Sequence, residues 1–598
     1  MGKPAKIDPE TFFYEGNQMG TPERIDPVTF SVVWGGLLTI AAEMGVTLSR
    51  TAYSVAVREG TDFSTAVFDP DGNLIAQGDY SPGHLGSMAF AVRRMLANFP
   101  VESLREGDAI ICNDPAIGSG HLPDIYMVSP AFLDDQLLGY AVNIAHQIDI
   151  GGAASGSQSV AGLFDNYQEG LRIMPTRLYT AGEPNADIFR MIEANVRVSD
   201  VLGDIRAQYA SNMGASRRLR ELGQRYGAPT LRGCMSEILS RSKEAMGNAL
   251  RELKPGTYSY EDCMDDVGPG TDPVVFKVTV TVSGDSINVD WTGSGPQRDA
   301  GMNSYLTYTT AYSIAAVKSV TLPNLPQNQG IIGAITVTAP EGCFLNPRRP
   351  APCGGRAVNS PRIYEVVMAA LSQAVPGRSL AAGSHMFNPI LGGLDPKTGQ
   401  PFVCWELTMG GVGARSNKDG LEATSFPANA SNVPIEVQES RRPVLFEHFG
   451  LIPDSAGAGT FRGGFGVRRD LQLTVGNVKM FNLGDRVKFA PFGLFGGHSG
   501  TKGVTLLNAG QSGERELNSK GTYTLDEGDV LSWRTSGAGG YGDPHARDPE
   551  RVVFDVEEGL VSPAAARNIY GVVVDPVTFE HDPVATAALR KTGKGSGA

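Results

Sequence analysis

The chain has 598 residues, of which 41% are hydrophobic and 19% charged, and it carries a formal net charge of −13 at pH 7. This length predicts several domains, and the acidic balance argues against a nucleic-acid-binding surface. We expect that no apolar run approaches the ~18 residues of a membrane span and that the first residues hold no apolar signal region, and the six cysteines lack C-x-x-C spacing. We therefore expect a cytoplasmic protein with reduced thiols and no membrane contact.

Residues 1–23 are polar and rich in Pro and Gly, which predicts an N-terminal arm lying against a partner. Asp-Pro steps at 8–9, 26–27 and 575–576 are each typical of a helix start, with Asp as the N-cap and Pro in the first turn. After Asp26 the apolar residues recur with helical spacing as far as Leu48. This pattern predicts one long amphipathic helix.

The next segments alternate between strand and helix patterns. We expect a hairpin formed by residues 63–68 and 74–77, a helix over 88–99, a strand over 108–112 and a helix-rich stretch over 185–253. From Gly256 the pattern is typical of β-strands, with helical patterns at 305–320 and 360–374. From about residue 400 short strands and Gly-rich loops dominate. The predicted fold class is α+β, multidomain and mostly antiparallel. The predicted parts are an arm (1–23), an α/β metal-binding domain (24–255), a mixed middle domain (256–400), a β-rich domain (401–545) and a helical C-terminal segment (546–598).

One predicted hairpin carries the most informative residues. Two apolar runs, Ile125–Leu133 and Leu137–Ala145, flank the polar break Asp134-Asp135-Gln136. Folding the chain back there places His146 opposite Asp124, and opposed residues of an antiparallel pair have Cβ atoms ~4.5–5.5 Å apart. His121 lies three residues before Asp124 in a loop bounded by Gly and Pro. Imidazole and carboxylate ligands of this kind suit zinc, manganese or iron better than calcium or magnesium.

Several neighbouring residues allow two interpretations. His84 is interpreted as ordering a helix N-terminus in preference to binding a metal. Asp149 is a candidate to orient His146 through a hydrogen bond, or a turn residue before Gly-Gly. Glu59 is a candidate general base or ligand, or an ordinary charged residue near a strand end, and Asp114 is interpreted as a turn cap. The cluster around His146 could itself be a set of buried hydrogen-bonding groups without a metal.

The chain lacks the motifs of several enzyme classes. The Gly-rich stretches at 454–459 and 461–466 resemble a phosphate-binding loop in composition but lack the G-x-x-x-x-G-K-[ST] pattern. There is also no G-x-S-x-G motif of a serine esterase. Nucleotide binding by this chain is therefore not expected.

Many short motifs in one order extend from about residue 24 to 575. They are Glu43-Met-Gly45, Arg58-Glu59 with Asp62-Phe-Ser64, His84–Met88, Asn113-Asp-Pro115, Gly120–Asp124, Ala145-His146 with Asp149–Gly152, Asn195-Val-Arg197, Pro453-Asp-Ser455, Gly459, Arg462-Gly-Gly464 and Gly539–Pro544. With these motifs the chain resembles the B-subunit family of ATP-dependent hydantoinases and 5-oxoprolinases, which includes subunits of acetone and acetophenone carboxylases.

The resemblance implies a set of metal ligands. Matching the family motifs residue by residue gives Asp62, His121, Asp124 and His146, so that Asp62 enters through the resemblance and not through spacing. Many members carry a second histidine where this chain has Gln147. This departure weakens a role for position 147 and leaves the four proposed ligands unchanged.

The resemblance also implies a partner and a reaction. A larger hydantoinase A-type subunit with an actin-like ATPase fold would bind ATP and Mg and phosphorylate the substrate oxygen, in a dimer of heterodimers. Water activated by the transition metal would then open a hydantoin, 5-oxoproline or lactam ring. Two alternatives stay open: a subunit of an ATP-dependent ketone carboxylase, with a possible third small subunit, and a scaffold whose partner performs the chemistry.

Overall fold

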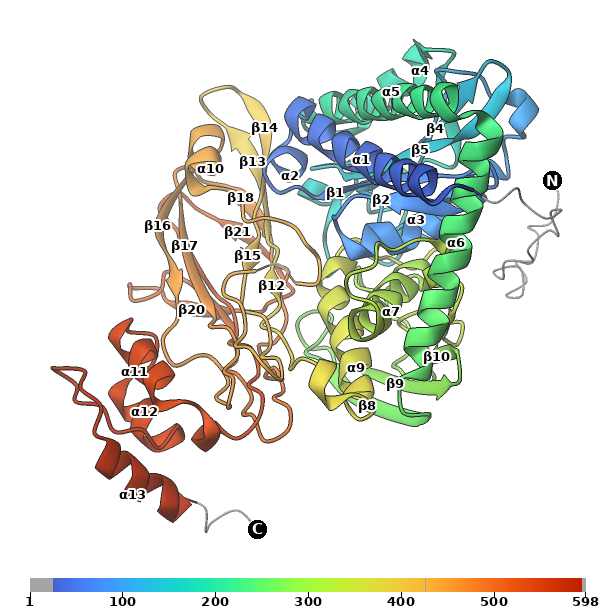
Figure 1. The fold of residues 1–598 in the computed structure, drawn as a ribbon. Coiled ribbons are helices and arrows are strands. Elements are labelled where there is room, and N and C mark those ends of the chain that lie inside the picture. The colour runs from blue at the N-terminus through green and yellow to red at the C-terminus, as the bar shows by residue number, and fades with distance from the viewer. Residues whose placement is uncertain (1–24, 425, 594–598) are drawn as a thin grey trace.

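The computed structural model describes residues 25–424 and 426–593, and the N-terminal arm predicted for residues 1–23 lies outside them. Figure 1 shows three regions. A sheet covered by long helices forms the N-terminal region, a smaller sheet with two buried helices follows it, and a β-rich region leads to short helices at the C-terminal end. This mixture of helices and mostly antiparallel sheets confirms the predicted α+β class. The five-part division of the chain stays a prediction.

The N-terminal sheet has seven strands in the order β2-β1-β5-β4-β3-β6-β7, and all neighbouring pairs are antiparallel. The strands are β1 (Phe63–Phe68), β2 (Leu74–Gln77), β3 (Ala109–Cys112), β4 (Asp124–Leu133), β5 (Gln136–His146), β6 (Thr176–Thr180) and β7 (Glu183–Pro184). The predicted hairpins β1–β2 and β4–β5 are both confirmed. Every residue of β1 is buried, as expected for strands covered on both faces.

Helices cover the two faces of this sheet. Successive side chains of a strand point to opposite faces. Val67 and Ala141 therefore pack on one face with α1 (Pro27–Thr51), α5 (Asp200–Tyr226) and α6 (Ala228–Arg251). Phe68 and Val142 pack on the other face with α3 (Pro82–Leu96). The helix-rich stretch predicted for 185–253 consists of α5, α6 and the short α4 (Ala186–Asn195).

Helix α1 begins as predicted, because Asp26 accepts a hydrogen bond of 2.8 Å from the Thr29 amide and Pro27 follows it. Its most apolar 18-residue window has a mean hydropathy of 1.5, so the expectation that no run approaches a membrane span is wrong for this helix. Buried residues such as Val33 and Met44 pack it onto the sheet. A core helix meets the same length and composition criterion, so α1 alone is weak evidence for a span.

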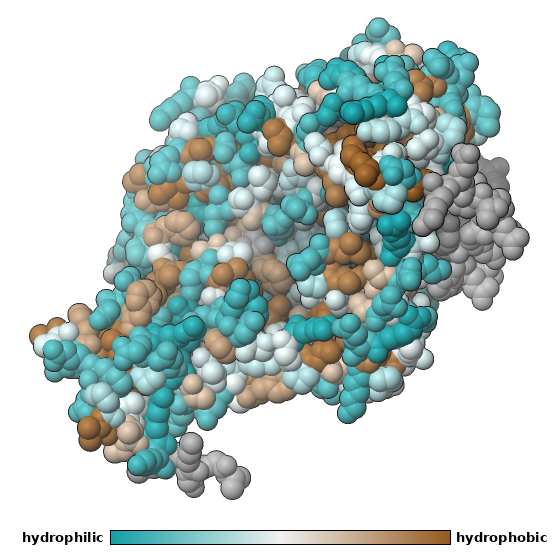
Figure 2. All heavy atoms as spheres, viewed as in Figure 1, coloured by the Kyte–Doolittle hydropathy of each residue, from teal (hydrophilic) through white to brown (hydrophobic). Residues whose placement is uncertain are grey.

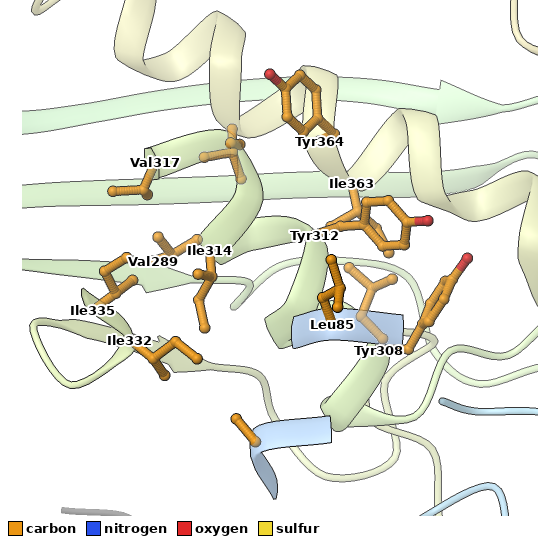
Figure 3. Packing of buried hydrophobic residues seen from close by; sticks show 14 of the residues in the cluster. Leu85, Val289, Tyr308, Tyr312, Ile314, Val317, Ile332, Ile335, Ile363 and Tyr364 are labelled. Carbon is orange, nitrogen blue, oxygen red and sulfur yellow. The ribbon is translucent and has the colours of Figure 1, made fainter. Parts of the chain in front are cut away.

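The middle region has a four-stranded sheet in the order β11-β10-β9-β8, in which only the β10–β11 pair among these strands is parallel. Its elements are β8 (Gly256–Met264), β9 (Val274–Ser283), β10 (Ser286–Asp290), β11 (Ile335–Thr338), α7 (Leu306–Thr321), α8 (Gln329–Ile332) and α9 (Ser360–Ser372). Figure 3 shows Ile314 and Val317 of α7 packed beside Val289 and Ile335, while Tyr308 and Tyr312 extend toward Leu85 of α3. The side chains of α7 thereby join the N-terminal and middle regions.

The C-terminal region is built from short antiparallel strands joined by Gly-rich loops. Its sheets have the orders β14-β13-β18-β21, β16-β17-β22-β19-β20 and β12-β15. The strands are β12 (Met386–Phe387), β13 (Ile390–Asp395), β14 (Gln400–Trp405), β15 (Thr408–Met409), β16 (Val444–Leu451), β17 (Val467–Leu473), β18 (Val478–Phe481), β19 (Val504–Leu507), β20 (Arg515–Leu517), β21 (Thr522–Leu525) and β22 (Val530–Arg534). The helices are α10 (Ile435–Arg441), α11 (Pro549–Glu557), α12 (Pro563–Ile569) and α13 (Pro583–Gly593). On the face drawn in Figure 2, apolar residues lie in small groups among hydrophilic ones.

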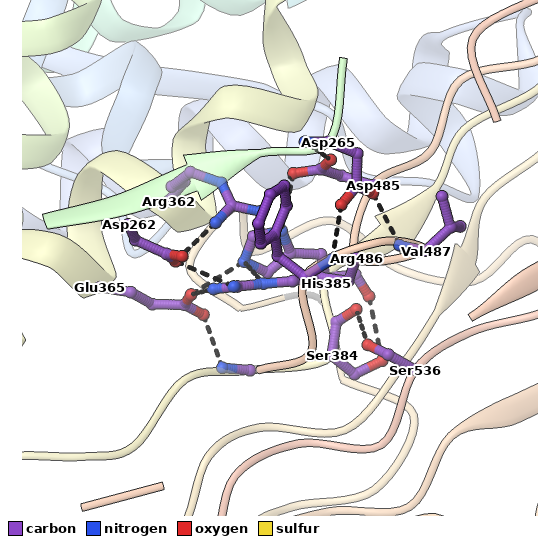
Figure 4. A network of polar contacts seen from close by, with 12 residues as sticks. Asp262, Asp265, Arg362, Glu365, Ser384, His385, Asp485, Arg486, Val487 and Ser536 are labelled. Carbon is purple, nitrogen blue, oxygen red and sulfur yellow. Dashed lines mark hydrogen bonds and ion pairs between the residues drawn. The ribbon is translucent and has the colours of Figure 1, made fainter. Parts of the chain in front are cut away.

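A buried network of ion pairs joins the middle and C-terminal regions (Figure 4). Arg362 of α9 binds Asp262 of β8 and, on the other side, Asp485, each at 2.5 Å. Arg486, next to Asp485, contacts Glu365 of α9 at 2.7 Å. Because breaking one partner of such a buried pair leaves an uncompensated charge, the network holds the two regions in one orientation.

Two predicted helix starts differ from the structure. Helix α3 begins at Pro82 instead of Met88, because Ser81 and Pro82 supply a start before the apolar pattern becomes regular. At Asp575-Pro576 the Asp575 carboxylate accepts the amides of Val577 and Thr578, which closes a turn instead of a helix. An Asp carboxylate that accepts the following backbone amides occurs both at helix starts and in turns, so an Asp-Pro pair alone does not distinguish a helix start from a turn.

Candidate metal centre

The strand ends of the N-terminal sheet bring the predicted residues together. Asp124, the first residue of β4, pairs directly with His146, the last residue of β5, as the hairpin prediction required. Strand β1 pairs with β5 on the other side, and the backbone N–H of His146 donates to the Asp62 carbonyl at 3.0 Å. Asp62 therefore flanks His146 across the β1–β5 pair. His121 lies in the loop that leads into β4.

Asp124 lies at the centre of the group. Its Oδ1 is 2.8 Å from Nε2 of His121 and 3.0 Å from Nδ1 of His146. One ligand atom from each of these three buried residues lies within 4.8 Å of the others. Asp62 is at the edge, with Oδ2 4.0 Å from Nδ1 of His146 and 21% of its side chain exposed. Three of the four predicted residues thus form a tight group, and the fourth borders it.

The ring of His121 is oriented by a backbone carbonyl. Its Nδ1 lies 3.1 Å from the Gly354 oxygen, and because a carbonyl can only accept, Nδ1 carries the proton. Nε2 is then left with a lone pair that faces Oδ1 of Asp124 at 2.8 Å, and with the proton on Nδ1 no proton bridges these two atoms. Metal-binding histidines commonly show this arrangement, in which the nitrogen away from the ion donates to a carbonyl or carboxylate.

The ring of His146 is oriented by a chain of two side-chain amides, those of Gln158 and Asn388. Its Nε2 lies 3.0 Å from Nε2 of Gln158, and Oε1 of Gln158 accepts from Nδ2 of Asn388 at 3.1 Å. Oδ1 of Asn388 is buried without a partner. Turning over both amides would keep the chain intact while presenting Oε1 of Gln158 to an Nε2–H of His146. Nδ1 of His146 would then be free to bind an ion.

Asp124 is also held by a buried arginine. An Nη atom of Arg356 lies 2.5 Å from Oδ2, and the Ser119 hydroxyl donates to the same oxygen. Burial by itself would raise the pKa of Asp124, but His121, His84 and Arg356 outweigh it and hold the pKa well below its usual range. Burial, reinforced by Arg356, lowers the pKa of His121 to about 4. At neutral pH the site therefore contains an ionised carboxylate and a neutral imidazole, the forms that bind metals.

His84 has both of the features considered from the sequence. It lies in the first turn of α3, and its buried Nε2 is 3.4 Å from Oδ2 of Asp124 and 3.8 Å from Oδ1 of Asp62. The preference for a purely helix-ordering role missed this contact with two carboxylates. A helix-start pattern describes only local sequence, whereas these contacts depend on where the helix packs.

The group borders a small cavity of about 40 Å³ between the three regions. A water molecule needs about 10–15 Å³ measured in this way, so an ion and a few small ligand atoms fit. The residues around it are Asp62, Ser81, His84, His121, Asp124, His146, Gln158, Tyr308, Tyr312, Arg356, Ala357, Ser360, Met386, Asn388, Trp405, Leu407, Ala428 and Ala430. A complete cyclic substrate would need some of these side chains to move.

The remaining candidates lie in other contacts. The carboxylate of Asp149 accepts hydrogen bonds from the amides of Gly151 and Gly156 and binds Arg197 at 2.8 Å, so it organises its own loop and not His146. Glu59 ends α2 (Val55–Arg58) and pairs with Arg58 at 3.4 Å, outside the cavity lining. Asp114 accepts the amide of Ile117, which agrees with its interpretation as a turn cap.

The charges and donors fit a divalent transition metal. Two carboxylates and one guanidinium leave the group with one net negative charge, which attracts a cation. The two imidazoles and the carboxylates form the N/O donor set of zinc, manganese or iron sites. Nε2 of His121 supplies a buried lone pair for such an ion, 2.8 Å from Oδ1 of Asp124. His121, Asp124 and His146 could therefore hold the metal, with Asp62 beside them.

The chain has relatives among known proteins. The family model described as hydantoinase B/oxoprolinase matches residues 26–544. The chain belongs to the hydantoinase B/oxoprolinase family. An uncharacterized protein of Methanocaldococcus jannaschii is 34% identical, over 90% of this chain and 94% of that protein. The caprolactamase subunit beta of Pseudomonas jessenii is 32% identical, over 94% of this chain and 98% of that subunit.

Solved structures of related proteins share the fold. The ATP-dependent caprolactamase of Pseudomonas jessenii matches with a TM-score of 0.88 and 30% identity, over 95% of this hydantoinase B/oxoprolinase chain and all of that one. A nucleotide-free acetone carboxylase matches with a TM-score of 0.86 over 95% of this chain and 83% of the other. At 18% identity, the second comparison establishes a shared fold alone.

Two residues at the centre were missed by sequence reasoning. Arg356 begins a short 3-10 helix, Arg356–Asn359, just before α9, and Gln158 lies in a loop after β5. Neither has a motif that links it to the hairpin, because their contacts join segments 232 and 12 positions apart without regular spacing. The Gly354-Gly355 pair is a weak local signal, since it lets the backbone pass close to other segments.

Proposed function

We propose that this chain is the metal-containing subunit of an ATP-dependent cyclic-amide hydrolase, acting on a hydantoin, 5-oxoproline or lactam that a partner subunit has O-phosphorylated. The observation that carries the proposal is the buried group His121, Asp124 and His146, in which Nε2 of His121 faces Oδ1 of Asp124 at 2.8 Å. The likeness to a caprolactamase subunit beta supports an amide ring as the substrate.

The proposed partner is a larger hydantoinase A-type subunit with an actin-like ATPase fold, which binds ATP and Mg. Two findings support it. The sequence has no phosphate-binding loop motif. The caprolactamase relative is named as a beta subunit, and its solved structure is described as ATP-dependent. We propose that the partner activates the substrate and that the cavity beside Asp124 receives the activated group.

The chain's own residues would prepare the site in three ways. A bound divalent metal would supply Lewis-acid chemistry and lower the pKa of water. Asp124 supplies an ionised oxygen and His121 a neutral nitrogen, since its proton is kept on Nδ1 by the Gly354 carbonyl. Trp405 covers His146, with ring centroids 6.1 Å apart, and the small cavity limits bulk water. Dry, preorganised donors act more strongly on developing charge than donors in water.

A substrate panel on the co-expressed complex tests the proposal. ATP loss is followed with lactams, hydantoin, 5-oxoproline and ketones, each with and without bicarbonate. We expect ATP loss with at least one cyclic amide and no requirement for bicarbonate. Bicarbonate-dependent ATP loss with a ketone, and none with any cyclic amide, would overturn the hydrolase and favour the ketone carboxylase.

Substitution of His121 tests the metal site itself. His121→Ala should reduce bound metal at least a hundredfold and abolish turnover while the complex still assembles, because the substitution removes one of the proposed ligand atoms. The matched control is His498→Ala, an exposed histidine outside the cavity. Metal content is measured by elemental analysis and assembly by gel filtration. Unchanged turnover in His121→Ala would favour the scaffold interpretation, in which the partner performs the chemistry.

A further inference from the structure

Arg356 has an unusual environment for a charged side chain. It is 4% exposed, its guanidinium lies 3.8 Å from the centre of the Tyr308 ring, and one Nη binds Oδ2 of Asp124 at 2.5 Å. Its Nε is buried without a hydrogen-bond partner. A buried guanidinium has five N–H donors to satisfy, and an unsatisfied one costs free energy. The side chain borders the cavity, so a ligand there could satisfy further donors.

The charge of the site changes sign when a metal binds. Without an ion, Asp62, Asp124 and Arg356 leave one net negative charge. A divalent ion converts this to one net positive charge in a buried space, where interactions between charges are stronger than in water. A buried net positive charge favours an anionic ligand. Since Arg356 already neutralises one carboxylate, the metal site is charge-balanced only when such an anion is also present.

The neighbouring side chains suit oxygen atoms. Tyr308 and Tyr312 of α7 border the cavity beside Arg356, as does Ser360 at the start of α9. Burial raises the pKa of both tyrosines, so each keeps a phenolic O–H that can donate. The planar guanidinium fork matches the oxygens of a carboxylate, carbonate or phosphoryl group. The small cavity admits such a group but not a large ring.

We propose that Arg356 and the metal together form a binding site for a small oxyanion: the phosphoryl or carboxylate oxygens of an activated substrate, or bicarbonate. The inference deepens the proposed function and rests on its metal site. Asp124 lies between the two cations and is shared by them. The oxyanion would contact the ion on one side and the guanidinium on the other, which orients the ligand in the cavity.

Anion titrations of the full-length chain test this assignment. The chain is loaded with Mn²⁺, and inorganic phosphate, bicarbonate and acetate are titrated separately, followed by the Mn²⁺ electron paramagnetic resonance spectrum and by calorimetry. We expect phosphate or bicarbonate to bind the Mn²⁺-loaded chain at least tenfold more tightly than the metal-free chain. Preference for phosphate would point to a phosphorylated substrate, and preference for bicarbonate to the carboxylase reaction.

Substitutions of Arg356 separate its contribution to anion binding from the contribution of the metal. Arg356→Met should keep Mn²⁺ binding, because removing a cation beside Asp124 does not weaken attraction for an ion, while phosphate affinity falls at least tenfold. Arg356→Lys keeps the charge but not the fork, and its phosphate affinity should fall about threefold to tenfold. If Arg356→Met does not fold, the phosphate affinity of Arg356→Lys tests whether the guanidinium binds the anion. Arg190→Met, on exposed α4, is the matched control and should bind both ligands normally.

Three outcomes would contradict the proposals in distinguishable ways. If the wild-type chain takes up no Mn²⁺, the metal site of the proposed function fails and the oxyanion site fails with it. If the wild type takes up Mn²⁺ but binds neither phosphate nor bicarbonate, only the oxyanion inference fails. If Arg356→Met and Arg356→Lys both bind phosphate within twofold of wild type, Arg356 serves only to neutralise Asp124.

Discussion

His121 and Gly354, 233 positions apart in the chain, are joined by a hydrogen bond of 3.1 Å between Nδ1 and the carbonyl oxygen. The loop that carries Gly354 is itself held by Glu169, whose carboxylate accepts the amides of Cys353 and Gly354 at 2.7 and 2.6 Å. The same loop leads to Arg356. One buried carboxylate thus positions both the carbonyl that orients His121 and the guanidinium that binds Asp124.

Glu169→Gln should remove part of the pH dependence of stability. Burial raises the pKa of Glu169 from 4.5 to about 7, so the folded chain binds this proton more tightly than the unfolded chain. Its contribution to stability is therefore full below about pH 4.5 and is lost as pH rises to about 7, with a total of the order of 3 kcal/mol. Urea unfolding at pH 5 and 7.5 should show a smaller loss in Glu169→Gln than in wild type.

The difference in pH dependence between wild type and Glu169→Gln separates the effect of Glu169 from the effects of other buried carboxylates. Glu406, whose pKa burial also raises to about 7, is unchanged in both and contributes equally. Gln at position 169 can still accept the two backbone amides through its carbonyl oxygen. Identical pH profiles in wild type and variant would contradict a raised pKa for Glu169.

Gln158→Leu should weaken metal binding by about 10–100-fold, because His146 loses the group that orients its Nε2. Gln158→Glu is the matched variant, since its carboxylate accepts from the His146 Nε2–H and should retain or strengthen the affinity. Competition with a chelating dye measures both. Equal affinities in wild type and Gln158→Leu would show that the amide chain does not control the His146 ring.

Gly120→Ala should destabilise the chain and disturb the site. Gly120 has φ +90°, and a Cβ there would lie 3.3 Å from Cβ of Tyr308, a tight contact that Tyr308 or the loop carrying His121 relieves by moving a few tenths of an ångström. Gly399→Ala is the control, because Gly399 has φ +68° with open space around it. We expect a backbone cost of about 1–2 kcal/mol in both variants and weaker metal binding only in Gly120→Ala. Urea unfolding and metal titration measure the two effects.

Asp124→Asn and Asp62→Asn should differ in stability. Asp124 is fully buried against Arg356, so removing its charge leaves an uncompensated cation and costs about 3–5 kcal/mol. Asp62 is partly exposed, and its substitution should cost less than about 1 kcal/mol. The double variant Asp124→Asn with Arg356→Met should recover part of the stability but no metal binding. Additive losses in the double variant would show that the pair is not coupled.

The core of the candidate site follows from local sequence. The runs on either side of Asp134-Asp135-Gln136 specify an antiparallel hairpin that brings Asp124 close to His146. The turn pairs Leu133 with Gln136, and a register shift of one position between Ala131 and Phe132 is what places Asp124 opposite His146 instead of Ala145. Asp62 directly precedes the strand that the local pattern predicts for residues 63–68. Its approach to His146 was implied by the family resemblance, because β1 and β5 pair across 67 intervening residues and no local pattern specifies that pairing.

By itself, the sequence determined the α+β class, the hairpin and the order of the family motifs, because turn residues and apolar periodicity act over a few neighbouring positions. Tertiary structure alone decided that Arg356, Gln158 and His84 meet Asp124 and His146, and that Asp149 binds Arg197 instead. These contacts join loops and helix ends whose positions depend on how three regions pack. Such packing follows from the summed burial of many side chains, and no short motif records it.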